Sequence, residues 1–164
     1  WIEEGGTLIS VVYPLSWLNS NELLEVKFID EAETDPDSFS YADRYKMNDM
    51  HRIAGSIFEI KADLSHPLFY GYNNPLIPVF KNRSTVIEDS GRAFAHPAKY
   101  TESPLLSGYS SEENIERIKG SPSIFIWKKG RGRIIHFMDN PNFRGKWHGT
   151  SKMFANAVFF GGII

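Results

Sequence analysis

The order of hydrophobic and polar positions predicts that this chain alternates between strands and helices. Residues 7–12, Thr-Leu-Ile-Ser-Val-Val, form an apolar, β-branched run without polar alternation, as in a strand covered on both faces. We therefore expect a central strand in parallel pairing. Asn19 and Glu22 have the spacing of a capping box, which predicts a helix that continues through residues 23–28. A strand followed by a helix is typical of an α/β domain.

The middle of the chain combines a long polar segment with short apolar runs. Residues 30–50 are rich in Asp and Glu and show neither a strand nor a helix period, so we expect a long surface loop that is a candidate for ligand binding. The acidic spacing lacks the alternating series and closing Glu of a helix-loop-helix calcium site, which argues against calcium. Residues 53–60 predict a strand, and residues 76–80 and 84–87 predict a hairpin.

The last third of the chain has the clearest signals. Ser110 and Glu113 form a second capping box and predict a short helix that ends at a glycine. Residues 123–128 and 133–138 predict a β-hairpin. A turn-rich loop follows, and a helix with a broad apolar stripe then runs from Thr150 to a glycine stop. Residues 130–164 should therefore close an α/β domain.

Composition limits the chemistry that the chain can perform. A length of 164 residues and a hydrophobic fraction of 41% fit a single packed domain over residues 1–164. The absence of Cys excludes a thiol nucleophile, a thiolate metal site and a disulfide. Residues 1–6 read as the end of a helix followed by a glycine stop, so we expect a C-terminal fragment of a longer protein with a fold that is incomplete at its N-terminus.

Charge is distributed unevenly along the chain. Residues 1–64 carry 13 acidic and 5 basic side chains, whereas residues 65–164 carry 7 acidic and 13 basic ones. Basic residues concentrate in the predicted hairpin and in the loop after it, a pattern that attracts phosphates. Solvated turns also carry charge for solubility, and we favour this interpretation over a nucleic-acid partner. No apolar run is long enough to predict a membrane span.

Catalytic motifs are not recognisable in the sequence. Only His136 has a carboxylate three or four residues after it, Asp139, and no second His is spaced to complete a zinc site. There is no Gly-x-Ser-x-Gly pentapeptide, and the pair Gly130 and Gly132 leads into a strand and not into a phosphate-binding helix. We therefore assign no catalytic, cofactor-binding or metal-binding residue.

The loop of residues 139–149 is the best candidate for ligand binding, because ligands of α/β proteins bind where sheet strands end. An alternative is that its amides hydrogen-bond to the loop backbone and that its aromatic residues fold onto the core. The candidate binding residues are Asp139, Asn140, Asn142, Arg144, Trp147 and His148.

Several short motifs, taken in order, resemble the C-terminal domain of large bacterial zinc carboxypeptidases of the carboxypeptidase A-like metallopeptidase superfamily. The resemblance covers most of the chain. It rests on Gly5-Gly6-Thr7-Leu8, His66-Pro67-Leu68 with Gly71, Leu106-Ser107-Gly108-Tyr109, Gly130-Arg131-Gly132-Arg133-Ile134-Ile135, Asp139-Asn140-Pro141-Asn142-Phe143-Arg144-Gly145, Gly149-Thr150, Phe154, Asn156-Ala157 and Phe160-Gly161.

This resemblance implies a three-layer α/β/α sandwich of the flavodoxin-like, class I glutamine amidotransferase-like kind. It also implies an exported parent enzyme, extracellular or periplasmic, that removes C-terminal residues from peptides with a zinc-bound water. The zinc motif of that family, His-x-x-Glu, has no counterpart here, so the resemblance implies a non-catalytic accessory domain without a cofactor of its own. Implied partners are the catalytic domain of the same polypeptide, its peptide substrate and a second copy paired through exposed sheet edges. The alternative is an independent peptide- or carbohydrate-binding module that uses residues 139–149.

Overall fold

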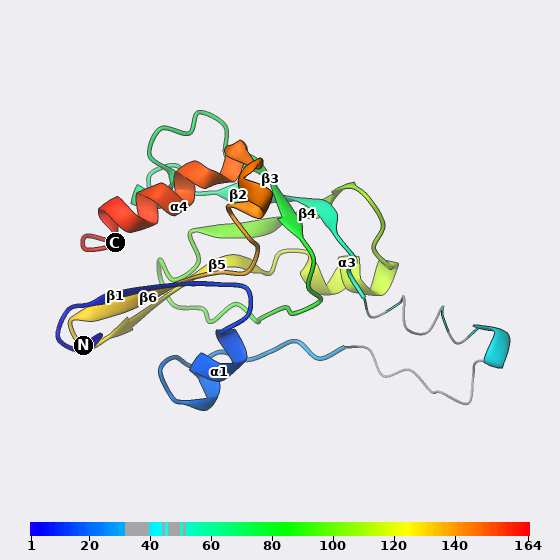
Figure 1. Ribbon diagram of the computed structural model, residues 1–164, viewed down its shortest axis with the longest axis horizontal. Coiled ribbons are helices and arrows are strands. Elements are labelled where there is room, and N and C mark those ends of the chain that lie inside the picture. The colour runs from blue at the N-terminus through cyan, green and yellow to red at the C-terminus, as the bar shows by residue number, and fades with distance from the viewer. Residues whose placement is uncertain (32–39, 44, 46–49, 51) are drawn as a thin grey trace.

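A computed structural model describes residues 1–31, 40–43, 45, 50 and 52–164 of this protein, and its centre is one six-stranded sheet (Figure 1). The strand order is β1-β6-β5-β4-β2-β3. The strands are β1 (Thr7–Val11), β2 (Ser56–Ala62), β3 (Leu76–Lys81), β4 (Ala98–Ser107), β5 (Pro122–Lys129) and β6 (Gly132–Phe137). Only β1 and β6 pair in parallel, and the other neighbours are antiparallel. The prediction of an α/β fold is confirmed at this level.

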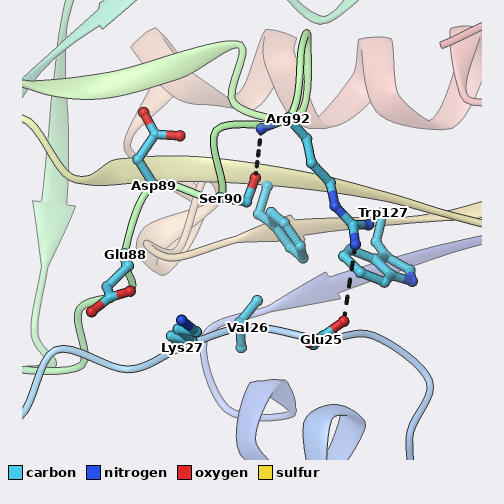
Figure 2. Close-up of a pocket in the computed structure, with 9 residues that line it drawn as sticks. Glu25, Val26, Lys27, Glu88, Asp89, Ser90, Arg92 and Trp127 are labelled. Atoms are coloured by element: carbon cyan, nitrogen blue, oxygen red, sulfur yellow. Dashed lines mark hydrogen bonds and ion pairs between the residues drawn. The ribbon is translucent and has the colours of Figure 1, made fainter.

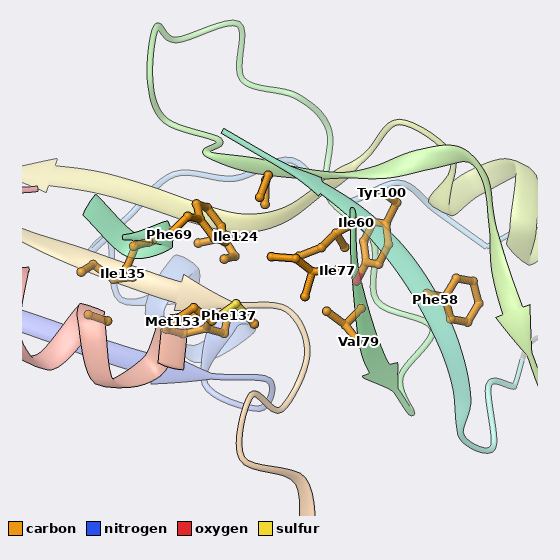
Figure 3. Close-up of a cluster of buried hydrophobic side chains, with 14 of the residues drawn as sticks. Phe58, Ile60, Phe69, Ile77, Val79, Tyr100, Ile124, Ile135, Phe137 and Met153 are labelled. Carbon is orange, nitrogen blue, oxygen red and sulfur yellow. The ribbon is translucent and has the colours of Figure 1, made fainter. Parts of the chain in front are cut away.

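The described helices lie on both faces of the sheet. They are α1 (Leu15–Ser20), α3 (Glu112–Ile118) and α4 (His148–Phe160), with short 3₁₀ turns at Tyr41–Asp43, Pro67–Phe69 and Phe143–Gly145. Figure 1 shows α4 and α1 on opposite sides of the β1–β6 pair. Two apolar cores follow from the alternation of side chains along the strands. The larger core includes Met153 and Ala157 of α4 (Figure 3), and the smaller one includes Leu15 and Leu18 of α1.

The β5–β6 hairpin and α4 confirm the predictions for the C-terminal region. The hairpin registers Ile124 with Phe137 and Lys129 with Gly132. Gly130 turns the chain with φ of 61°, and a Cβ at this position would lie 2.6 Å from the carbonyl oxygen of Glu3. Both the turn geometry and the close approach of the N-terminal segment therefore require glycine there.

The N-terminal prediction was correct in the pairing of its strand and wrong in two other respects. β1 pairs in parallel, as expected, but it stands at one end of the strand order and not at its centre. Residues 23–28 are not helical, and Asn19, the expected capping residue, lies near the end of α1, which stops at Ser20. The side chain of Asn19 instead accepts a hydrogen bond from the backbone N–H of Val26 at 3.0 Å, and Glu22 has φ of 56°. A local turn therefore replaces the predicted cap.

The predicted hairpin of residues 76–80 and 84–87 is also wrong. β3 pairs with β2, with Ile77 opposite Ile60, while Ile87 forms an isolated antiparallel bridge with Phe28. The preceding strand prediction, residues 53–60, overlaps β2 and is confirmed in its position to within a few residues. Most of the acidic loop lies outside the described residues, which omit 32–39, 44, 46–49 and 51. The prediction of ligand binding by this loop and the argument against calcium concern those residues.

The helix α3 forms where it was predicted, but its capping residue is the next serine along the chain. The Oγ of Ser111, and not that of Ser110, accepts the hydrogen bond from Asn114 N–H at 3.2 Å. Ser111 also donates to the carbonyl of Met50 at 2.8 Å. Among the described residues, the buried hydroxyl of Ser110 has no hydrogen-bond partner.

The two serines should respond differently to alanine substitution. Ser111→Ala is expected to lower the free energy of unfolding by about 1 kcal/mol, because an N-cap bond is lost. Ser110→Ala is expected to change it by less than about 0.5 kcal/mol, since no bond is removed. Urea denaturation of both variants measures the difference, and a larger loss for Ser110→Ala would contradict the assignment of the cap.

Candidate functional site

Asp139, the first residue of the predicted binding loop, lies inside the protein at the end of β6. Its carboxylate belongs to a buried polar cluster, here called the Asp139 network, that consists of Lys81, Tyr100, Ser123 and Asp139. The hydroxyl of Tyr100 donates to Oδ2 of Asp139 at 2.6 Å, and the ammonium of Lys81 lies 3.6 Å from Oδ1. Ser123 makes a longer contact to Oδ2 at 3.5 Å. The network therefore joins three strands, β3, β4 and β5, to Asp139, which lies two residues after the end of β6.

Lys81 is fully buried, at 0% exposure. Its ammonium donates to Tyr100 Oη at 3.0 Å and, more weakly, to the carbonyl of Thr85 at 3.4 Å, and the carboxylate of Asp139 is the third neighbour. Burial lowers the pKa of Lys81 and raises the pKa of Asp139, while the charge of each opposes the shift of the other. Burial and the nearby Asp139 charge raise the pKa of Tyr100 well above its usual value, so Tyr100 remains a donor.

His136 lies in β6 beside the Asp139 network. Its Nδ1 is 2.8 Å from the hydroxyl of Ser10 in β1. The other ring nitrogen, Nε2, is buried and has no hydrogen-bond partner in the part of the chain that the structure describes. Burial, with a smaller contribution from the charge of Lys81, lowers the pKa of His136 to about 4. The ring is therefore neutral near pH 7.

The other loop residues do not join Asp139. The side chain of Asn140 accepts a hydrogen bond from the backbone N–H of Asn142 at 2.9 Å, as in an Asx turn. Arg144 is exposed, has φ of 53°, and lies over the ring of Phe143. These contacts are local, and they correspond to the structural interpretation of the loop.

Trp147 and His148 complete the predicted set. The indole N–H of Trp147 donates to the carbonyl of Pro78 in β3 at 3.1 Å, and the preceding Phe143 stacks on Phe80 with ring centroids 3.6 Å apart. His148 is exposed at the start of α4. The structure thus places Asp139 inside the protein and Asn142, Arg144 and His148 on its surface, so the six candidates do not face one common pocket.

A pocket lies instead on the α1 side of β5, and we call it the Trp127 pocket (Figure 2). Its volume is about 170 Å³. Phe125 and Trp127 of β5 form its aromatic floor, with ring centroids 5.9 Å apart. The wall residues come from the segment before the Phe28 bridge and from the loop before β4: Glu25, Val26, Lys27, Glu88, Asp89, Ser90 and Arg92.

Arg92 crosses the Trp127 pocket. Its guanidinium lies 3.8 Å from the centroid of the Trp127 ring and 3.9 Å from a carboxylate oxygen of Glu25. Figure 2 shows Arg92 beside Trp127 and its ion pair with Glu25. The side chains of Arg92 and Glu25 are 54% and 79% exposed, so their ion pair is weak and exchangeable. Ser90 and His96 hold the loop beside it, with Ser90 N–H donating to His96 Nε2 at 3.0 Å.

Sequence reasoning did not identify Lys81, Tyr100 or Arg92. Lys81 ends the apolar strand β3 and Tyr100 lies in the mixed strand β4, both far from Asp139 along the chain, and no spacing rule links them. Phe125 and Trp127 were recognisable as residues of a strand. The pocket above them was not, because its walls come from residues 25–27, 88–90 and 92, which are far away in the sequence. A lysine at the end of an apolar run was the one signal available, because buried lysines require a partner.

In the described part of the chain, no group of three or more His, Asp or Glu side chains is placed to hold a metal ion. Among the same residues, no helix has the length and apolar character needed to cross a membrane.

Comparison with known proteins gives little further information. No protein-family model matches the chain, and no curated protein is similar to it. Among solved structures, the chain is similar to a cytoplasmic protein from Salmonella typhimurium, with 15% sequence identity and a TM-score of 0.47. The match covers 97% of this chain and 56% of the other, so this chain spans little more than half the length of that protein.

Proposed function

We propose that this chain is a non-catalytic accessory domain of a zinc metallocarboxypeptidase, an enzyme that removes C-terminal residues from peptides. The observation that carries the proposal is the burial of the Asp139 network. Asp139 stands after a sheet strand, where α/β enzymes place catalytic groups, but it is 5% exposed and accepts a hydrogen bond from the buried Tyr100. A carboxylate in this position stabilises the fold and does not contact a substrate.

The proposal includes a flavodoxin-like, three-layer origin of the fold. The parallel β1–β6 pair, with α1 and α4 on opposite faces, supports this origin (Figure 1). The antiparallel pairing of β2, β3, β4 and β5 departs from that architecture. We therefore propose that the C-terminal region preserves the parental layers and that the remainder of the sheet has been remodelled.

The proposed parent supplies the zinc and the catalytic groups, and this chain supplies none. Its partners would be the catalytic domain of the same polypeptide, the peptide substrate and a second copy. The open side of β1, at the end of the sheet, supports pairing with another chain. Export to the periplasm or the extracellular space follows from the proposed parent. An independent binding module that uses residues 139–149 is less well supported, because Trp147 and Asp139 are engaged within the protein.

The test is to assay the natural full-length polypeptide and the isolated chain for release of C-terminal residues from peptides. We expect zinc-dependent hydrolysis by the full-length polypeptide and none by residues 1–164, with or without added zinc. A full-length polypeptide that lacks a His-x-x-Glu motif, or that retains no zinc-dependent activity, would overturn the proposal. Hydrolysis by the isolated chain would overturn it as well.

A further inference from the structure

The edge of β5 that faces β4 changes its partner along the strand. β4 pairs with β5 at Ile124 and Pro122 only. Further along, the backbone N–H of Ile126 donates to the carbonyl of Ala95 at 2.8 Å, and Ala95 belongs to the loop before β4. Strand β4 therefore does not extend along the second half of β5, where the loop before β4 bonds to this edge at Ile126.

The alternation of hydrogen-bonded pairs along the β5–β6 hairpin determines which main-chain groups of β5 face the edge opposite β6. The N–H of Met138 donates to the carbonyl of Ser123 at 3.0 Å, and hydrogen-bonded pairs alternate from there along an antiparallel ladder. Phe125, Trp127 and Lys129 thus bond to β6, while Ile126 and Lys128 point away from it. Within the described residues, no backbone hydrogen bond reaches the carbonyl of Ile126 or either main-chain group of Lys128.

Pockets flank this edge on both faces of the sheet. The Trp127 pocket lies on the face of Phe125 and Trp127. A second pocket of about 330 Å³, the Ile126 pocket, involves the alternate residues Ile126 and Lys128. Its other lining residues are His66, Arg92, Ala93, Phe94, Ala95 and Ile164. Because consecutive side chains of a strand point to opposite faces, a strand added at this edge would direct neighbouring side chains to the two pockets.

The two pockets differ in chemistry. The Ile126 pocket combines apolar walls with Lys128 and His66, and no acidic residue lines it. Arg92 also borders this pocket, but its guanidinium lies over the Trp127 ring. Burial lowers the pKa of His66, so Lys128 is the cation of this pocket. Phe94 stands beside it with φ of 63° and 86% exposure, an unfavourable conformation for an aromatic residue that places the ring at the rim. The Trp127 pocket is smaller and has an aromatic floor, so it suits one apolar side chain.

We propose that the β5 edge at Ile126–Lys128 binds an extended peptide as an added strand. The peptide residue opposite Lys128 is acidic, enters the Ile126 pocket and pairs with the ammonium of Lys128. The adjacent peptide residue is apolar and enters the Trp127 pocket. Main-chain bonds to Lys128 provide affinity, and the alternation of acidic and apolar side chains provides specificity. This inference goes beyond the accessory role, because it holds whether or not the parent is a zinc peptidase.

The test is fluorescence polarisation of the protein with a labelled peptide of about eight residues that has the core Thr-Val-Glu-Val-Thr. We expect saturable binding that weakens about tenfold or more when the peptide Glu is replaced by Lys, since one ion pair is exchanged for a repulsion. A peptide that is N-methylated at the Glu residue should lose a similar factor, because it cannot donate its main-chain hydrogen bond at Lys128. The N-methylated peptide tests strand addition without any change in the protein.

Matched variants locate the site. Lys128→Glu should weaken binding about tenfold, and Lys61→Glu, an equal charge change at an exposed position of β2, should leave it unchanged. Equal binding of the Glu, Lys and N-methylated peptides, or no binding up to about 1 mM, would overturn the proposal. It would also be overturned if Lys128→Glu converts a self-associated protein to a monomer in sedimentation, since a second copy would then occupy the edge.

Discussion

Replacing Asp139 with leucine is expected to lower the free energy of unfolding by about 3–5 kcal/mol, because the substitution leaves Lys81 buried without its counter-charge. Lys81 is inaccessible to water, so solvent does not replace the lost carboxylate. Tyr100 loses the acceptor of its 2.6 Å hydrogen bond at the same time. Urea denaturation at neutral pH measures the loss. An unchanged slope of the transition shows that the variant exposes the same surface area on unfolding as the wild type.

A double-mutant cycle separates the buried charge from the loss of packing. Lys81→Met alone should also destabilise the protein, but the double variant Lys81→Met, Asp139→Leu should be more stable than the sum of the single losses predicts. Asp89→Ala is the control, because the Asp89–Lys99 pair is almost half exposed and should contribute at most about 1 kcal/mol. Additive losses at Lys81 and Asp139 would show that the two charges do not interact.

The second large effect is expected from acid, through His136. Its pKa is about 4 in the folded protein, against an ordinary value of about 6.5, so the unfolded chain binds a proton more readily between those values. Stability therefore rises with pH across this window, and falls by about 3 kcal/mol as the pH decreases from 6.5 to 4. Below pH 4 both states are protonated and the contribution stops changing.

His136→Gln isolates this contribution. The difference in unfolding free energy between wild type and His136→Gln should be constant above pH 7. Near pH 4 the wild type should have lost about 3 kcal/mol of stability relative to the variant. Lys81 and Asp139 are present in both proteins, so their own titration largely cancels in the difference. Parallel stability curves from pH 7 to pH 4 would contradict the buried, neutral state of His136, as would an imidazole NMR signal that titrates near its ordinary pKa.

The elements that sequence reasoning located correctly are those specified by local interactions. The β5–β6 hairpin has a turn that requires Gly130, and α4 has an apolar stripe of helical period and a glycine at its end. Residues 23–28 and 84–87 were misassigned because both are short apolar runs without a clear period. Each becomes ordered through the other at the Phe28–Ile87 bridge, which no local pattern records.

Sequence analysis identified one residue of the buried site, Asp139, but not the residues that contact it. Asp139 was identified because it follows a strand, but its exposure and chemistry depend on Tyr100, 39 residues away, and on Lys81, still further along the chain. The other predicted ligands, such as Arg144 and His148, share the loop without sharing its interior position. Proximity in sequence did not imply convergence in space.

The sequence by itself determined the α/β class, the C-terminal hairpin and helix, and the absence of cysteine chemistry, because these depend on composition and on interactions between near neighbours. Only the tertiary structure decided that β1 lies at the end of the sheet, that Lys81 and Asp139 are buried together, and that β5 has an open edge between two pockets. The physical reason is that strand order and burial result from long-range packing. The same apolar run can occupy the centre or the edge of a sheet, and only its neighbours determine which.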